Sequence, residues 1–307
     1  MNKPIRSLAV VLGLLFFVLL VGVNHLQVVK ATDLNARSDN RRVIDEEFSR
    51  ERGAILVAGE PIAESVPTDS GWEFQREYPE GKLYADITGF YSYIYGREGI
   101  EQTYNSVLSG SDDRLFVNQL VDLVSNKKPQ GGSVELTINP AAQRAAASGL
   151  AELGSTRMGA VVAIEPETGA ILAMTSQPSY NPNRLASHDL QSVQEAWKKL
   201  TENEKKPMLN RSTRTAVPPG STFKLVTAAA GIEDLDLGAD DRVKGGRQLT
   251  FPGISYTLRN SGGGSCGGNR ITFENALAIS CNVSYGWMGL KVGQEALADK
   301  AEDFGFE

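Results

Sequence analysis

Two domains are the default expectation for a chain of 307 residues, and the 41% of hydrophobic residues suffices for sizeable cores. The 31 basic and 37 acidic residues give a net charge of −6 without a long run of lysine or arginine, which does not support nucleic-acid binding. The two cysteines and two histidines form no cluster in the sequence, so we expect no metal site.

The first predicted element is an apolar helix at the N-terminus. After Lys3 and Arg6, 16 apolar or glycine residues make up Leu8–Val23, and the next charged residue is Lys30. A cleaved secretory signal has an apolar region of roughly 7 to 15 residues and a small-residue cleavage site; this run is longer, and no Ala-x-Ala follows it. A bilayer core needs about 20 residues, which Ser7–Val29 supplies. We therefore expect an uncleaved anchor, with the N-terminus inside and the rest of the chain outside the cytoplasmic membrane.

Residues 31–130 are predicted to form a charged stalk, up to about Arg52, and then a small α+β pedestal domain without a catalytic cluster. Glu98 and Glu101 lie one helical turn apart and resemble paired carboxylates, but this spacing is more typical of a solvated helix face. A Gln-Gly-Gly turn at residues 130–132 predicts a boundary. The expected domains are therefore a tail and anchor (1–30), a stalk and pedestal (31–130) and a larger domain (131–307).

The larger domain is predicted to be mixed α/β, with helices flanking a sheet. Alternating apolar residues in Val134–Ile138 indicate a half-buried strand, and Pro140 begins a helix that runs to about Leu153. A hairpin follows from Gly159 and turns at residues 165–169.

A serine and a lysine stand at the start of the next predicted helix. Pro218–Gly220 favours an extended entry and a tight turn before Ser221, and Leu225–Ala230 has no polar face. A helix that is apolar on every side is normally buried. Lys224, one turn after Ser221, would then lose hydration, and both desolvation and the helix N-terminus favour its neutral amine. The pattern predicts a serine nucleophile with a lysine base.

The alternative is that Ser221 only caps a helix while Lys224 extends into water. Ser-x-x-Lys is expected by chance about once in a chain of this size, and it recurs at Ser125–Lys128, which is predicted to be a solvated turn. A Ser-His-Asp triad has one candidate base, His188, because His25 lies in the apolar run.

A second polar element is Ser280-Cys281-Asn282, between a capped helix over residues 272–279 and a new helix over residues 283–291. A hydroxyl and a carboxamide two residues apart can face one cleft, where Ser280 could relay a proton and Asn282 could bind a substrate amide. The glycine-rich stretch 261–268 before them is predicted to be a flexible linker, although its glycines could also let the backbone approach a ligand.

With these motifs in this order, the chain resembles the class B penicillin-binding proteins, the membrane-anchored transpeptidases of cell-wall synthesis, and especially those of the penicillin-binding protein A type. The resemblance also covers Gly159–Met174, Pro178–Asn183, Arg52–Ile55 and Gly96–Glu101.

The resemblance implies a serine acyltransferase that acts on peptidoglycan stem peptides ending in D-Ala-D-Ala. Ser221 would be the acylated nucleophile, Lys224 its base, and Ser280 and Asn282 the second catalytic element. This chemistry would need neither a metal nor an organic cofactor. A neighbouring stem amine would resolve the acyl-enzyme into a cross-link, and β-lactams would trap Ser221. Cell-wall assembly proteins are the implied partners. The alternatives are a serine carboxypeptidase or β-lactamase, which passes the acyl group to water, and a non-catalytic membrane scaffold.

One family motif is missing from the sequence. The Lys-Thr-Gly or Lys-Ser-Gly motif is expected on a strand after Asn282, and the nearest match, Lys291-Val292-Gly293, is predicted to be a helix C-cap. We therefore expect residues 1–307 to be a fragment that penicillin labels slowly, because losing one oxyanion-hole donor typically costs about 10²- to 10³-fold in rate.

Cys266 and Cys281 are predicted to form a disulfide. They are the only cysteines, 14 residues lie between them, and the expected compartment is oxidising. Closing such a loop is worth about 3 kcal/mol in the chain-entropy model. The alternative is two buried thiols.

Overall fold

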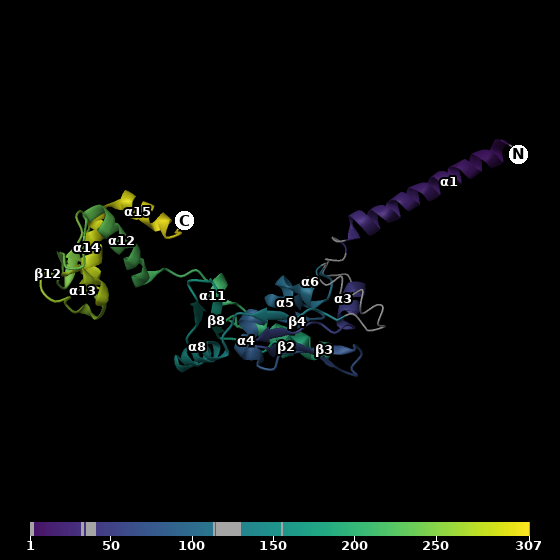
Figure 1. The fold of residues 1–307 in the computed structure, drawn as a ribbon, viewed down its shortest axis with the longest axis horizontal. Coiled ribbons are helices and arrows are strands. Elements are labelled where there is room, and N and C mark those ends of the chain that lie inside the picture. Colours follow the sequence, from purple (N-terminus) through teal and green to yellow (C-terminus); the bar gives the residue numbers. More distant parts are fainter. Residues whose placement is uncertain are drawn as a thin grey trace. The chain divides into compact units, whose positions relative to one another are not determined.

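Two structural units make up the chain, residues 1–215 and 216–307, and each is described by itself (Figure 1). The computed structural model describes residues 3–31, 34, 41–112, 114, 130–154 and 156–306. The elements of the first unit are α1 (Lys3–Asn24), η1 (His25–Val29), α3 (Arg41–Phe48), β1 (Ile55–Val57), β2 (Glu60–Pro67), β3 (Phe74–Glu77), α4 (Gly81–Thr88), β4 (Tyr91–Ser92), β5 (Gly96–Arg97), α5 (Ile100–Thr103), α6 (Asn105–Leu108), β6 (Val134–Leu136), α8 (Pro140–Glu152), β7 (Gly159–Ile164), β8 (Ile171–Gln177), α9 (Asn183–Ala186), α10 (Leu190–Thr201) and α11 (Arg211–Arg214).

The N-terminal helix confirms the predicted apolar element. α1 continues into the π-helical turn η1, and together Pro4–Val29 form a 26-residue helix that is long and apolar enough to cross a membrane. None of its most apolar stretch is buried against the rest of the protein. This exposure is what a helix in contact with lipid requires.

A four-stranded sheet with the order β3-β2-β1-β6 forms the core of the first unit. β1 pairs antiparallel with β2 and parallel with β6, with Ile55 opposite both Ala63 and Val134. Ile55, Val57 and Leu108 are at most 2% exposed in this core. Because β6 lies after the predicted boundary at residues 130–132, that boundary does not coincide with a break in the sheet.

The remaining predicted elements of this unit are present. α8 begins at Pro140, and the Asn139 side chain caps it by accepting hydrogen bonds from Ala141 N and Ala142 N, both at 3.0 Å. β7 and β8 form the predicted hairpin, with Val162 opposite Met174, and α8 packs against it.

Glu101 corrects the expectation of a solvated carboxylate pair. Its side chain is 0% exposed and lies between two guanidinium groups, with Arg52 Nε 2.6 Å from Oε2 and Arg76 Nε 2.7 Å from Oε1. Tyr78 Oη donates a further hydrogen bond to Oε1 at 3.1 Å. Burial alone would raise the pKa of Glu101, but Arg76 and Arg52 together hold it below its ordinary value of 4.5. Glu98, in contrast, is 30% exposed and pairs with Arg214.

We expect Glu101→Gln to destabilise the first unit by about 3 to 5 kcal/mol, because it leaves two buried guanidinium groups without a counter-charge. Glu98→Gln is the matched control, and it should cost less than about 1 kcal/mol since its partner Arg214 is 62% exposed and remains hydrated without the pair. Urea unfolding followed by tryptophan fluorescence measures both. The carboxylate of Glu101 should stabilise the first unit fully above pH 4.5. This stabilisation should disappear as the pH falls through the lowered pKa of Glu101. Equal effects of the two variants would contradict the role of the buried cluster.

The second unit consists of helices around short antiparallel strand pairs. Its elements are η3 (Gly220–Phe223), α12 (Lys224–Leu235), β9 (Arg242–Lys244), β10 (Gln248–Thr250), β11 (Thr257–Arg259), η4 (Ser261–Gly263), β12 (Arg270–Thr272), α13 (Phe273–Ala278), α14 (Asn282–Val292) and α15 (Gln294–Asp303).

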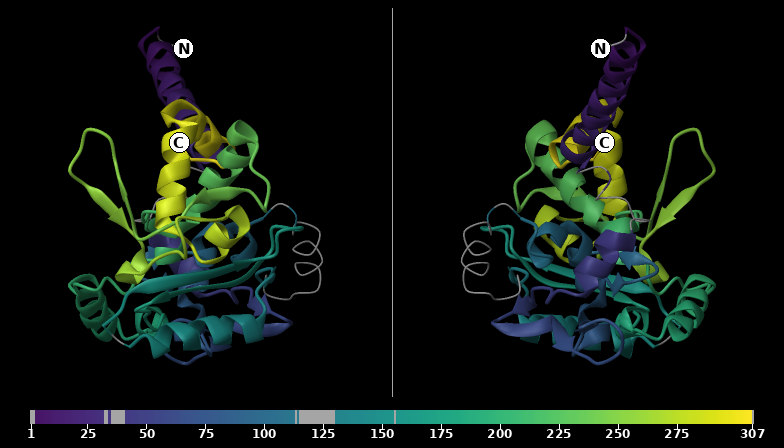
Figure 2. Two further views of the ribbon diagram at one scale, coloured as in Figure 1. Left: turned by 90° about the vertical axis from the view of Figure 1, so that its left-hand side faces the viewer. Right: turned by 90° about the vertical axis from the view of Figure 1, so that its right-hand side faces the viewer.

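Two strand pairs pack against α14 in this unit. β9 pairs with β12, and β10 pairs with β11 in a hairpin whose tip extends away from the helices (Figure 2). A Cβ at Gly286 of α14 would lie 2.6 Å from a methyl of Leu258 and 3.0 Å from a methyl of Leu249. The missing side chain at Gly286 therefore lets the helix approach the β10–β11 hairpin closely.

The helix after Ser221 is buried on one face only, which corrects the expectation of a helix buried all round. Val226 and Ala230 of α12 are at most 2% exposed, whereas Leu225 and Ile232 are 54% and 53% exposed. An apolar composition specifies no orientation, so packing against α14 and α15 selects the buried face.

Candidate active site

Ser221 lies in a 3₁₀ turn that precedes α12. Gly220 has φ of +57°, a left-handed conformation that glycine adopts without steric cost, and Ser221 is exposed directly after it. In a 3₁₀ turn the residues i and i+3 eclipse each other. Lys224 is the first residue of α12, and its Nζ therefore lies 3.4 Å from Ser221 Oγ. The predicted pair is close in space, although the α-helix begins three residues later than expected.

Lys224 Nζ brings together all four residues that the sequence analysis selected. Besides Ser221 Oγ, it contacts the backbone oxygen of Ser280 at 2.7 Å, Ser280 Oγ at 2.8 Å and Asn282 Oδ1 at 2.6 Å. Lys224 is therefore the centre of a cluster that joins η3 to the loop between α13 and α14. Among the described residues, no carboxylate bonds to it.

The partners of Lys224 suit both of its protonation states. A neutral amine has two N–H donors and one lone pair, whereas an ammonium has three donors. The backbone oxygen of Ser280 and Oδ1 of Asn282 only accept, so they can take the two protons of the neutral form. The lone pair is then free for the hydroxyl of Ser280 or Ser221. In the charged form a hydroxyl oxygen accepts the third proton, so a proton can arrive or leave without rebuilding the cluster.

Partial burial shifts the pKa of Lys224 downward. Loss of hydration lowers the pKa of Lys224 below its ordinary value of 10.5. The ring of Tyr285, whose centroid is 5.7 Å from Nζ, favours the cation weakly and does not reverse this direction. The neutral base is therefore populated at a lower pH than in a solvated lysine.

Ser280 has a left-handed backbone that directs two oxygens at Lys224. Its φ is +54°, a conformation that costs a non-glycine residue roughly 1 to 2 kcal/mol. The strain occurs where α13 ends and α14 begins, between Ala278 and Asn282. Strained backbone that persists at such a junction is typical of functional sites.

Asn282 is the first residue of α14, and the surrounding bonds fix the orientation of its carboxamide. Nδ2 donates to the backbone oxygen of Arg259 at 3.0 Å, so Oδ1 faces Lys224. No pattern in the sequence points to Arg259 or its neighbour Asn260, because a contact between residues more than 20 positions apart leaves no local signal.

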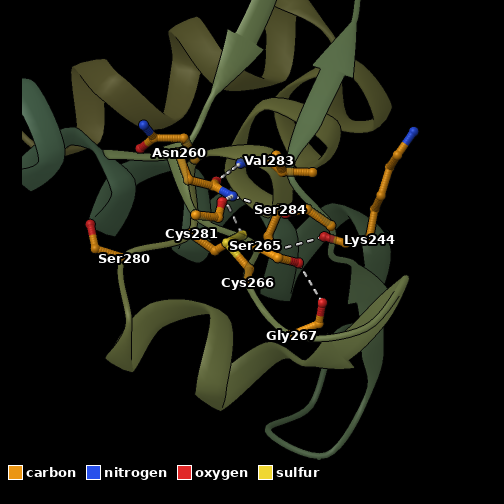
Figure 3. The surroundings of a disulfide bond; sticks show 12 residues. Lys244, Asn260, Ser265, Cys266, Gly267, Ser280, Cys281, Val283 and Ser284 are labelled. Atoms are coloured by element: carbon orange, nitrogen blue, oxygen red, sulfur yellow. Dashed lines mark hydrogen bonds between the residues drawn. A yellow bond between two sulfur atoms is a disulfide. The ribbon is translucent and has the colours of Figure 1, made fainter. Parts of the chain in front are cut away.

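Cys266 and Cys281 form a disulfide that links the glycine-rich stretch to the Ser280–Asn282 loop (Figure 3). Both residues are at most 5% exposed. The stretch is not a loose linker as expected: Cys266 N donates to the backbone oxygen of Gly246 at 3.1 Å, and Ser261–Gly263 form the 3₁₀ turn η4. The glycines permit a tightly bonded loop rather than a flexible one.

We expect thiol titration of the denatured, unreduced protein to find no free thiol. Reduction should expose two and should destabilise the second unit by about 3 kcal/mol, the chain-entropy value for a loop of this size. Two free thiols before reduction would contradict the disulfide.

The other motifs considered in the sequence are Lys291–Gly293, His188 and Ser125–Lys128. Lys291 lies in the last turn of α14, and Gly293 ends that helix with φ of +91°, which confirms the predicted C-cap. Nδ1 of His188 lies 2.6 Å from Ser70 Oγ, so this histidine already pairs with a different serine. Ser125–Lys128 lies outside the described residues.

Two family models match the chain: the penicillin binding protein A dimerisation domain over residues 52–134 and the penicillin binding protein transpeptidase domain over residues 159–307. The peptidoglycan D,D-transpeptidase PbpA of Mycolicibacterium smegmatis is 40% identical over 311 residues, which cover 100% of this chain and 63% of that protein. PbpA of Mycobacterium tuberculosis is 39% identical over 312 residues, with the same two shares, 100% and 63%.

Solved structures of penicillin-binding protein A from M. tuberculosis are similar in fold. Its ceftriaxone acyl-enzyme complex aligns with a TM-score of 0.81 at 39% identity, over 86% of this chain and 59% of that one. Its penicillin G acyl-enzyme complex gives 0.80 at 39% identity, over 84% and 60%. The chain thus spans about 63% of the length of these curated relatives. Both domain types, the whole-chain identity and the shared fold place this chain in the penicillin-binding proteins of the penicillin-binding protein A type.

Proposed function

We propose that this protein is a peptidoglycan D,D-transpeptidase that acts through an acyl-enzyme on Ser221. The observation that carries the proposal is the cluster around Lys224 Nζ, with Ser221 Oγ at 3.4 Å, Ser280 Oγ at 2.8 Å and Asn282 Oδ1 at 2.6 Å. The activity of PbpA and the acyl-enzyme complexes of penicillin-binding protein A support it.

The proposed reaction begins when Ser221 Oγ attacks the carbonyl carbon between the two D-alanines of a stem peptide. Lys224 takes the hydroxyl proton, and its lowered pKa makes the required neutral amine accessible. The proton then passes through Ser280 Oγ to the nitrogen of the departing D-alanine as the amide bond breaks. An ester between Ser221 and the shortened peptide remains.

The second half of the proposed reaction runs in reverse order. The amine of a neighbouring stem peptide attacks the ester carbonyl, loses a proton to the same Lys224–Ser280 pair, and forms the new amide. Ser221 regains its proton and leaves as a free hydroxyl. Asn282 is the proposed partner of the substrate backbone in both halves. A β-lactam follows the first half only, because its leaving nitrogen stays attached to the acyl group and blocks the second amine.

The anchor and the three-part organisation complete the proposal. α1 and η1 would hold the protein in the cytoplasmic membrane as a single span, with residues beyond Lys30 outside, where peptidoglycan lies. Residues 31–130 would serve as stalk and pedestal, and residues 131–307 would belong to the transpeptidase domain. Cell-wall assembly proteins are the proposed partners.

The full-length protein, given a stem pentapeptide and an acceptor peptide with a free side-chain amine, tests this function. We expect release of free D-alanine together with a cross-linked product of matching amount. Release of D-alanine with the unlinked tetrapeptide alone would show a carboxypeptidase, and no release together with no penicillin adduct would favour a scaffold. Either result would overturn the proposed transpeptidase.

A further inference from the structure

Asn260 joins three segments of the second unit. It follows β11 directly, and its Nδ2 donates to the backbone oxygens of Gly246 and Gly264, both at 2.9 Å. Its Oδ1 accepts from the backbone N–H of Val283 at 3.2 Å (Figure 3). Both donor hydrogens and the acceptor oxygen of this carboxamide are therefore in use.

The bond to Val283 caps α14 from a different loop. A helix normally obtains such a cap from the side chain of the residue before its first turn. Here that residue is Cys281, whose side chain makes no capping hydrogen bond and whose sulfur is in the disulfide. Val283, the second residue of the helix, would otherwise carry an unpaired N–H. Asn260 supplies the missing acceptor.

Arg259, the residue before Asn260, binds Asn282, the residue before Val283. The backbone oxygen of Arg259 accepts from Asn282 Nδ2 at 3.0 Å, which turns Asn282 Oδ1 toward Lys224 at 2.6 Å. Two consecutive residues at the end of β11 thus fix the first two residues of α14. A shift of this segment would move Asn282, and with it the orientation of Lys224.

The carboxamide of Asn260 also restrains the loop that carries Cys266, the disulfide partner of Cys281. The loop that carries Cys266 contains five glycines in residues 261–268, so the disulfide alone ties Cys281 to a deformable backbone. The bonds from Asn260 to Gly246 and Gly264 restrain that backbone.

We propose that Asn260 is a positioning residue for acyl transfer: it caps α14 from outside the helix and so holds Asn282, and through it Lys224, in the reactive arrangement. This inference depends on the proposed function, because it assigns a role in the acylation of Ser221.

The experiment compares Asn260→Ala with Asn269→Ala in the full-length protein, using a fluorescent penicillin as the probe. Asn269 is the matched control, since it is an exposed asparagine close to the same loop. We expect Asn260→Ala to lower the acylation rate constant about 10- to 100-fold, the scale for a misplacement of about 1 Å near a reacting group. Asn269→Ala should change it less than about twofold.

A double-mutant cycle separates positioning from general stability. If Asn260 acts through Asn282, then Asn260→Ala should change the rate less than about twofold when Asn282 is already alanine. A full 10-fold or larger effect in that background would overturn the inference. Asn260→Ser, whose side chain is too short for all three bonds, replaces Asn260→Ala in the cycle if the alanine variant does not fold.

The intact mass of the wild-type protein after exposure to penicillin distinguishes failure of the proposed function from failure of the positioning role. If penicillin forms no adduct on the wild-type protein, the proposed function itself is wrong. If the wild-type protein is acylated and Asn260→Ala is acylated as fast as Asn269→Ala, the function stands and the positioning role is wrong.

Discussion

Ser221→Ala in the full-length protein is expected to abolish the covalent penicillin adduct while the fold is retained. The proposed step forms an ester on Ser221 Oγ, and alanine has no atom that can form one. Intact-mass measurement after exposure to penicillin G should therefore show one adduct on the wild-type protein and none on the variant. Peptide mapping should place the wild-type adduct on Ser221.

Ser265→Ala is the control for this substitution. Ser265 is an exposed serine of the same unit whose hydroxyl bonds only to the backbone of Gly267 among the described contacts. Its variant should be acylated at the wild-type rate. An adduct that persists in Ser221→Ala, or that maps to Ser125, would show that the nucleophile has been assigned wrongly.

Lys224→Ala is expected to slow acylation by a factor on the order of 10² or more, the usual scale for loss of a general base. Lys224→Arg should be similarly slow: it keeps the positive charge, but a guanidinium does not deprotonate at working pH. The arginine variant therefore separates the role of a base from the role of a charge. Lys291→Ala, an exposed lysine in the last turn of α14, should acylate normally.

The pH dependence of acylation provides a further measurement on Lys224. The neutral amine is the active form, and burial lowers the pKa of Lys224 below 10.5, so the wild-type rate should rise with pH and reach its midpoint below that value. Lys224→Ala should lack this rise. A wild-type rate that falls as the pH increases toward the midpoint would contradict a lysine base.

Several parts of the candidate site followed from the sequence because they depend on near neighbours. The three-residue spacing of Ser221 and Lys224 places them together in any helical turn, and Thr272 caps α13 by accepting from Asn275 N at 3.2 Å. The apolar run of α1 and the C-cap at Gly293 are equally local. Residue types and short-range periodicity are sufficient for such features.

The selection of Ser280 and Asn282 required more than local pattern. The sequence indicated only that a hydroxyl and a carboxamide could face one cleft. Tertiary structure brought them within 2.8 Å and 2.6 Å of Lys224, across 56 and 58 positions of the chain. It also gave Ser280 its left-handed backbone, which serine does not adopt by preference.

Residues a few positions apart are sufficient to specify the apolar N-terminal helix, the strand and helix periods, the helix caps and the spacing of the Ser-Lys pair. Long-range packing, in contrast, selects the buried face of α12, pairs β6 with β1 and orders the loop of residues 261–268. Long-range packing also buries Glu101, because a carboxylate can lose its water only where counter-charges replace it, and Arg52 lies 49 positions away. Contacts at such separations depend on how the whole chain packs, which no local pattern records.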